Sequence, residues 1–224
     1  FLVATLGAVL ILVAIFTFGY AVLTSVVEEK QSRVVEVVLS TVRAKDLLMG
    51  KVLGLGLLGI AQLVVFVAAM LAAATLSDRI QLPNTTPSAI GLLAVWFILG
   101  FSLYTTALGF LGALASRMEE ASNAAPPVMI VAIVSLTVSV SAVLSEPNGT
   151  IATIVTFLPP TAPFVIPMRA AFGAISPLEV GLATVTTLAA MWALFAVGAR
   201  IYSGAVLQTV GRTKLRHAWR PAVG

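Results

Sequence analysis

Apolar residues form long blocks along this chain: five runs of membrane-spanning length are separated by shorter polar segments. A transmembrane α-helix needs about 20 mostly apolar residues to cross the hydrocarbon core of a bilayer. The runs predict spanning helices over residues 2–25, 52–76, 90–115, 127–145 and 180–200. The fold class that follows is an all-α integral membrane protein, with one transmembrane domain over residues 1–224.

The polar segment after the first run has a helical pattern. One face of residues 28–42 carries Glu29, Arg33, Glu36 and Ser40, opposite a valine-rich face. This pattern predicts an amphipathic helix that lies along the membrane surface with its charges in the cytosol. Its charge pairs stabilise the helix by only a few tenths of a kcal/mol each, so two interpretations stay open: the charges bind a partner, or they are simply solvated.

A second unusual segment, residues 150–176, is apolar but broken by prolines. Its pieces, about 151–158 and 164–175, are too short to span, and Pro159, Pro160, Pro163 and Pro167 interrupt them. We expect a re-entrant helical hairpin that dips into the outer leaflet, because irregular backbone at that depth must be covered by protein or line a wet cavity. Arg169 within it is a candidate functional residue, with snorkelling to lipid phosphate as the alternative.

Composition supports a membrane protein, and charge gives its orientation. Hydrophobic residues make up 59% of the 224 residues and charged ones 10%, far from the balance of soluble domains. Of the 13 Lys and Arg residues, all but Arg79 and Arg169 fall on one side of the predicted spans. The positive-inside rule therefore places loops 26–51 and 116–125 and the C-terminal tail in the cytoplasm. The basic tail suits anionic lipid headgroups better than nucleic acid.

The chain shows little chemistry of its own. It has no cysteine, a lone His217, no HExxH motif and no GxxxxGK[ST] phosphate loop. We therefore expect no enzyme activity, no cofactor and no metal site in this chain. The predicted span interiors lack ionisable residues, which argues against the alternative of an ATP-independent secondary transporter or channel.

Four stretches of the sequence, in their order, resemble a known family. They are EEKQSRVVEVVLSTVRAKDLLMGKVLG, SRMEEASNAAPP, FLPPTAPFVIPMR and the basic tail after the last run. Together they resemble the membrane-spanning permeases of type-2 (ABC-2 type) ATP-binding-cassette exporters, particularly the subgroup with sodium-efflux and drug exporters.

The resemblance implies a larger assembly in the bacterial inner membrane. Such permeases have six spans per half, with a large exterior domain between the first two. The resemblance therefore implies that Phe1 lies within the second span and that the first span and exterior domain precede this sequence. The implied partners are membrane lipid, a second permease half, identical or different, and a P-loop ATPase subunit that binds ATP and magnesium.

The resemblance also implies site residues. The cytoplasmic helix after the second span couples these permeases to their ATPase, and the matching residues here are Glu29, Arg33, Glu36, Thr41, Arg43 and Asp46. Glu119 and Glu120 are a second expected cytoplasmic contact, with a plain hydrated turn as the alternative. The expected outer gate consists of Pro159, Pro160, Pro163, Pro167 and Arg169. The substrate stays open among sodium, a drug, a lipid and a peptide.

Overall fold

The computed structural model describes residues 2–31, 50, 53–62, 64–65, 68 and 87–205. All regular secondary structure in these residues is helical, which confirms the all-α class. Four helical stretches are long and apolar enough to cross a membrane: Thr5–Glu29, Gly91–Leu114, Met118–Ser145 and Pro177–Leu194. They coincide with four of the five predicted spans. The predicted span 52–76 is only partly described, as the short apolar helix Leu53–Gln62.

The first span is built from three helical pieces that follow one another directly. These are α1 (Leu2–Ala14), the π-helix η1 (Ile15–Gly19) and α2 (Tyr20–Gln31). The chain therefore does not leave the helix near residue 25, where the predicted span ends. No Gly or Pro interrupts α2, and its last turn consists of good helix formers, so the helix continues through Glu28 and Glu29. Residues 32–42 of the predicted amphipathic helix lie outside the described part of the chain.

The other long helices are α5 (Pro87–Leu114), α7 (Pro126–Ser145) and α10 (Pro177–Ala205). Each begins at a proline, which suits a helix start because the first N–H groups have no partner inside the helix. A short helix, α6 (Met118–Ala124), leads directly into α7. The N–H groups of Val128 and Met129 both donate to the Ala125 carbonyl oxygen across this junction, so the two prolines leave little of the helix start unsatisfied.

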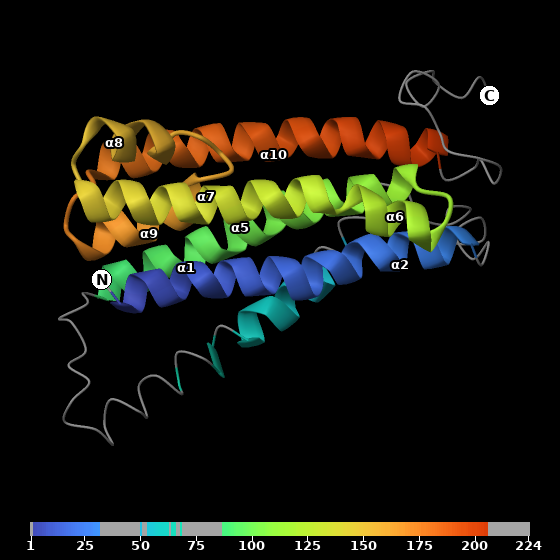
Figure 1. The fold of residues 1–224 in the computed structure, drawn as a ribbon, viewed down its shortest axis with the longest axis horizontal. Helices are drawn as coiled ribbons and strands as arrows, with labels where there is room; N and C mark the ends of the chain where they lie inside the picture. Colours follow the sequence, from blue (N-terminus) through green and yellow to red (C-terminus); the bar gives the residue numbers. More distant parts are fainter. Residues whose placement is uncertain are drawn as a thin grey trace.

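The long helices lie side by side, and the bundle has two distinct ends (Figure 1). At one end the short helices α8 (Thr150–Thr156) and α9 (Ala162–Ala171) lie near the start of α1. We call this the α9 end. The opposite end, which we call the α6 end, contains α6 together with the last turns of α2 and α10.

The core lies around α5, which packs against α2, α9 and α10. Its largest buried side chains are aromatic and include Trp96, Phe97, Phe101 and Tyr104. Phe97 and Phe101 stack with ring centroids 6.2 Å apart, and Tyr104 meets Phe164 of α9 at 6.1 Å. The short helix α9 is therefore part of the same core as the spans.

Helices α2 and α5 approach each other closely at one glycine. A Cβ atom at Gly112 would lie 2.6 Å from the Leu23 carbonyl oxygen, which belongs to the backbone of α2. Real Cβ atoms essentially never come so near another atom, and a helix backbone cannot swing aside as a side chain can. Small residues of this kind let membrane helices pack at short range. The contact between α2 and α5 therefore requires a glycine here.

Candidate functional sites at the two ends of the bundle

The proline-broken segment forms a helical hairpin at the α9 end. Helices α8 and α9 are joined by a turn over residues 157–161 that contains Pro159 and Pro160. Pro163 lies in the first turn of α9, and Pro167 lies inside the helix, where it removes one backbone donor. At the usual rise per residue the ten residues of α9 extend only about 15 Å, roughly half of a bilayer core. The structure thus has the two short helices that the prolines predicted.

The turn of this hairpin lies deep between the spans. The Tyr104 hydroxyl of α5 donates to the Pro160 carbonyl oxygen at 2.8 Å and lies 3.2 Å from the Ser135 hydroxyl of α7. At the usual helical rise, Tyr104 is about 20 Å along α5 from Gly91, where the candidate span begins. The hairpin turn therefore reaches well past the third of the bundle nearest the α9 end.

Two further hydroxyls from the spans approach the same turn. Ser139 of α7 lies 3.4 Å from the Thr161 carbonyl oxygen, and Thr186 of α10 lies 3.3 Å from that of Phe157. The Thr161 carbonyl oxygen also accepts the Val165 N–H of α9 at 3.0 Å, and hydrocarbon would offer a turn carbonyl no partner of its own. Side chains from three different spans thus supply the polar contacts that let a non-helical turn sit at this depth.

Arg169, near the end of α9, is buried against protein. Its Nε donates to the Pro147 carbonyl oxygen, and its Nη1 donates to the Thr156 hydroxyl and to Glu179 Oε1, each at 2.9 Å. The side chain of Arg169 is 3% exposed and that of Glu179 is 23% exposed. The structure therefore places Arg169 in an internal ion pair, and not at the lipid surface as the snorkelling alternative required.

The turn between α9 and α10 holds both members of this ion pair in position. Gly173 has a φ of 64°, and the Ala174 and Gly173 N–H groups donate to the Arg169 and Ala170 carbonyls, which ends α9 in a Schellman motif. The Ser176 N–H donates to Glu179 Oε2 at 2.8 Å, and the Glu179 N–H donates to the Ser176 hydroxyl at 3.2 Å. This reciprocal pair is a capping box at the start of α10.

Sequence reasoning missed Glu179 as a functional residue. The local signal was present, because Ser176-Pro177-Leu178-Glu179 matches the capping-box pattern with proline at the first helical position. That pattern predicts where α10 begins. It does not predict the ion pair with Arg169, which depends on how the chain folds back between the two residues.

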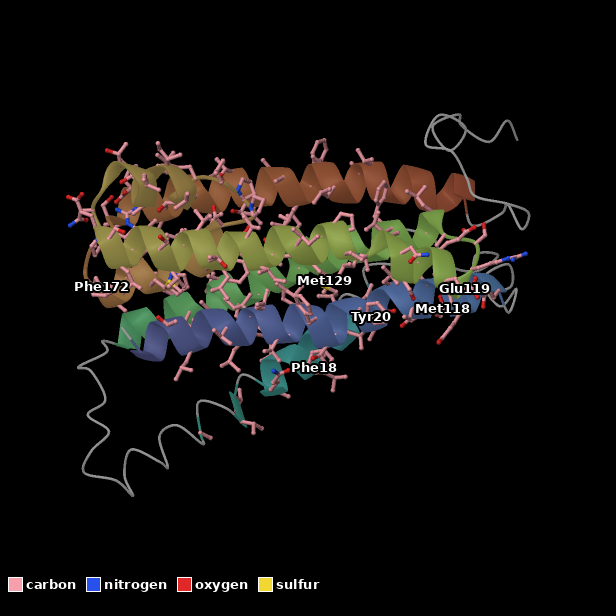
Figure 2. All side chains as sticks on the ribbon, in the orientation of Figure 1. Phe18, Tyr20, Met118, Glu119, Met129 and Phe172 are labelled. Carbon is pink, nitrogen blue, oxygen red and sulfur yellow. The ribbon has the colours of Figure 1, made fainter. Side chains whose placement is uncertain are left out.

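The predicted contact residues at the α6 end differ in their surroundings. Glu120 Oε2 accepts a hydrogen bond from the Ser116 backbone N–H at 2.9 Å, so this carboxylate closes the turn before α6. Glu119 is exposed. Figure 2 shows Tyr20, Met118 and Glu119 close together where α2 meets α6, and the hydroxyls of Tyr20 and Ser122 lie 3.0 Å apart. Of the two glutamates, Glu119 is the one presented outward.

Most of the predicted coupling residues lie outside the described part of the chain: Arg33, Glu36, Thr41, Arg43 and Asp46. Glu29 is described and lies half-buried in the last turns of α2. Among the described residues, no three His, Cys, Asp or Glu side chains gather as they would around a metal ion.

Comparisons with known proteins give the family. The chain is 27% identical over 222 residues to "Uncharacterized protein YhaP" of Bacillus subtilis, covering 91% of this chain and 52% of that protein. It is 27% identical over 199 residues to "Uncharacterized protein MJ1024" of Methanocaldococcus jannaschii, covering 88% of this chain and 48% of that protein. This chain thus spans about half the length of these relatives. No solved structure matches it.

A family profile covers most of the chain. The profile described as "ABC-2 family transporter protein" matches residues 2–201, which include every helix described above up to the last turn of α10. The match agrees with the several apolar helices of a multi-pass membrane protein. This chain belongs to the ABC-2 family of transporter proteins.

Proposed function

We propose that this chain is the membrane-spanning permease part of an ATP-binding-cassette exporter. ATP would be hydrolysed by a separate P-loop ATPase subunit, and a second permease half would complete the transport path. The observation that carries this proposal is the family match over residues 2–201. The two-ended bundle supports it, since the α6 end, where Arg117 and Glu119 are exposed, lies opposite the end that contains the buried helix α9.

The α6 end is the proposed cytoplasmic side, where the ATPase binds. The positive-inside rule supports this side, because Lys30 and Arg117 both lie there. The proposed interface consists of Glu29, Arg33, Glu36, Thr41, Arg43 and Asp46, with Glu119 as a further contact. Glu120 is left out, since its carboxylate already bonds to the backbone of the preceding turn.

The α8–α9 hairpin is the proposed outer gate. ATP binding would favour a conformation in which the coupling segments are drawn together and the hairpin opens; such a switch requires ATP to bind the two conformations with different affinities. The hydroxyl contacts of Tyr104, Ser139 and Thr186 with the turn support this role, because they join the hairpin to three separate spans. Movement of those spans relative to one another would break some of these contacts.

The coupling interface is tested by copurification of the full-length protein from its native membranes. We expect a P-loop ATPase to copurify with the wild type and to be lost in an Arg33→Glu, Glu36→Arg variant. Glu146→Arg is the matched control, because Glu146 is an exposed charge at the α9 end and its reversal should leave the ATPase bound. If cross-linked wild type yields no ATPase, the proposal fails and an ATP-independent transporter becomes the better assignment.

The gate is tested with single cysteines, since the described chain has no cysteine of its own. Ser139 is fully buried beneath the hairpin, whereas Ser141 on the same helix is exposed. With a small membrane-impermeant thiol reagent added outside, Ser139→Cys should react only during ATP turnover by the assembled transporter. Ser141→Cys should react to the same extent with and without ATP. Equal reactivity of Ser139→Cys in both conditions would contradict an opening gate.

A further inference from the structure

An apolar groove runs along the bundle on the α6 side of the hairpin turn. Its volume is about 360 Å³. Leu103, Tyr104 and Ala107 of α5 form its floor; Val128 and Val131 of α7 form one wall; Ala190 and Leu194 of α10 form the other. Pro159 and Pro160 of the turn close one end, and Pro127 lies at the opposite end. The volume falls within the range of small-molecule binding sites, roughly 300–1,000 Å³.

The groove offers no polar group to a ligand. All of its lining surface is apolar. The hydroxyl of Tyr104, which lines the groove, already donates to the Pro160 carbonyl oxygen. No charged side chain lines the groove within the described residues. A polar or charged ligand would therefore lose its hydration without compensation, which costs several kcal/mol for a neutral group and far more for an ion.

The groove opens sideways between α7 and α10. Within the described residues, α7 and α10 both pack on α5 but hardly touch each other. Their outward side chains face away from protein, with Val131 45% exposed and Trp192 74% exposed. In a bilayer, a hollow at this depth would be surrounded by lipid tails. If the hollow stayed empty, the side chains that line it would lose their dispersion contacts along its whole length.

The hollow at the α9 end of the bundle is different in character. It has a volume of about 540 Å³ and is lined in part by Thr137, Ser141, Ser145 and Glu146 of the α7 end and by Thr150 of α8. Hydroxyls and a carboxylate suit water or polar groups. The apolar groove has no such groups, so its lining suits a ligand that is purely hydrocarbon.

We infer that the groove binds one acyl chain of a membrane amphiphile. It is the loading site at which a cargo with a hydrocarbon tail leaves the bilayer and meets the hairpin turn. The cargo role rests on the proposed function, whereas binding of the chain rests on the groove alone.

The test is photolabelling of the full-length protein in native-lipid vesicles. The probe is phosphatidylethanolamine with a diazirine midway along one acyl chain, and labelled peptides are mapped by mass spectrometry. We expect label to concentrate on Ala107, Val131 and Ala190, and to fall several-fold in Ala190→Phe, whose ring fills the groove. Ala189→Phe is the matched control, because Ala189 is the exposed neighbour outside the groove and the same change there should leave labelling intact.

A second variant, Ala107→Leu, also fills the groove, from its floor. It provides the same test if the Ala190→Phe protein does not fold. Label spread evenly over the exposed faces of α7 and α10, and insensitive to both filling variants, would overturn the inference. That pattern is expected of lipid that only surrounds the protein.

The cargo role is measured separately. When the copurified ATPase is held with a non-hydrolysable ATP analogue, labelling of the groove should fall several-fold, since the loading site changes shape. Undiminished labelling would make the chain a structural lipid and overturn the cargo role. If no ATPase copurifies but the groove is labelled, the proposed function fails while the acyl-chain site stands.

Discussion

Helices α9 and α10 are neighbours in the chain and both are largely apolar, yet they lie in different surroundings. Eight consecutive residues of α9, Ala162 to Arg169, are buried against protein. In α10, by contrast, Leu178, Val185 and Trp192 are 72%, 63% and 74% exposed. We expect lipid to surround this face of α10, so side-chain shape should matter little there. For α9 these eight side chains pack against protein, as in the core of a soluble protein.

This difference predicts a steep contrast in tolerance to substitution. Changes in α9 and its contacts should lower stability, whereas changes on the outer face of α10 should not. Four substitutions test this contrast through the midpoint of thermal unfolding of the detergent-purified full-length protein.

Arg169→Ala should have the largest effect. It removes three hydrogen bonds from a charged donor, each worth about 1.5–3 kcal/mol, and leaves Glu179, whose side chain is 23% exposed, without its cation. The midpoint should fall sharply. Arg169→Lys should be intermediate, since a lysine keeps the charge but not the planar set of donors. An unchanged midpoint in Arg169→Ala would show that α9 is not held by this pair.

Gly100→Ala should come next, because it forces α5 and α9 apart. The new Cβ would lie 2.5 Å from Pro163 Cβ, and the proline ring cannot rotate away. Overpacking of this kind costs about 1–3 kcal/mol. Gly91→Ala is the matched control on the same helix, with no atom near the added methyl group, and it should leave the midpoint unchanged or slightly raised. Equal behaviour of the two variants would contradict close packing of α9.

Tyr104→Phe should have a smaller effect. The ring still packs against Phe164, but the Pro160 carbonyl oxygen loses its donor, at a cost of about 1–3 kcal/mol for a buried group left unpaired. Tyr20→Phe is the comparison at the α6 end, where the hydroxyl contact with Ser122 is exposed. We expect almost no change there. A larger loss in Tyr20→Phe than in Tyr104→Phe would reverse the assignment of the rigid end.

Val185→Ala should have the smallest effect. Val185 is 63% exposed on α10, so its methyl groups contact lipid and little protein. Exposed substitutions of this kind usually change stability by less than about 0.5 kcal/mol. A marked fall in the midpoint would show that a protein surface, and not lipid, covers this face of α10.

The contrast between α9 and α10 also marks what sequence could predict. Four of the five spans, including α10, were predicted because a run of apolar residues of sufficient length is enough to specify a membrane helix. The prolines from Pro159 to Pro167 also predicted the broken hairpin, since ring geometry acts locally. The helix of the first span continues to Gln31, past the predicted end of the span at residue 25, because charged residues in its last turns do not stop a helix.

The contacts that hold the hairpin could not be predicted in the same way. Nothing near Tyr104 in the sequence indicates that its hydroxyl meets Pro160, a residue more than fifty positions away. The partner of Arg169 is only ten residues along the chain, yet the pair forms because a Schellman motif reverses the chain between them. Such contacts depend on the path of the backbone in three dimensions. The periodicity and composition of the sequence do not predict that path.

The glycine at position 112 has a mechanical consequence. With Leu23 backbone atoms directly against it, α2 and α5 cannot slide past one another without a steric clash, so we expect them to move as one rigid body. Leu103, Tyr104 and Ala107, which form the groove floor, belong to that body. A force applied at Gln31 would then displace the groove floor and the Tyr104 hydroxyl together. A bulkier residue at position 112 would force α2 away from α5, and we expect the groove floor then to follow movements of Gln31 less closely.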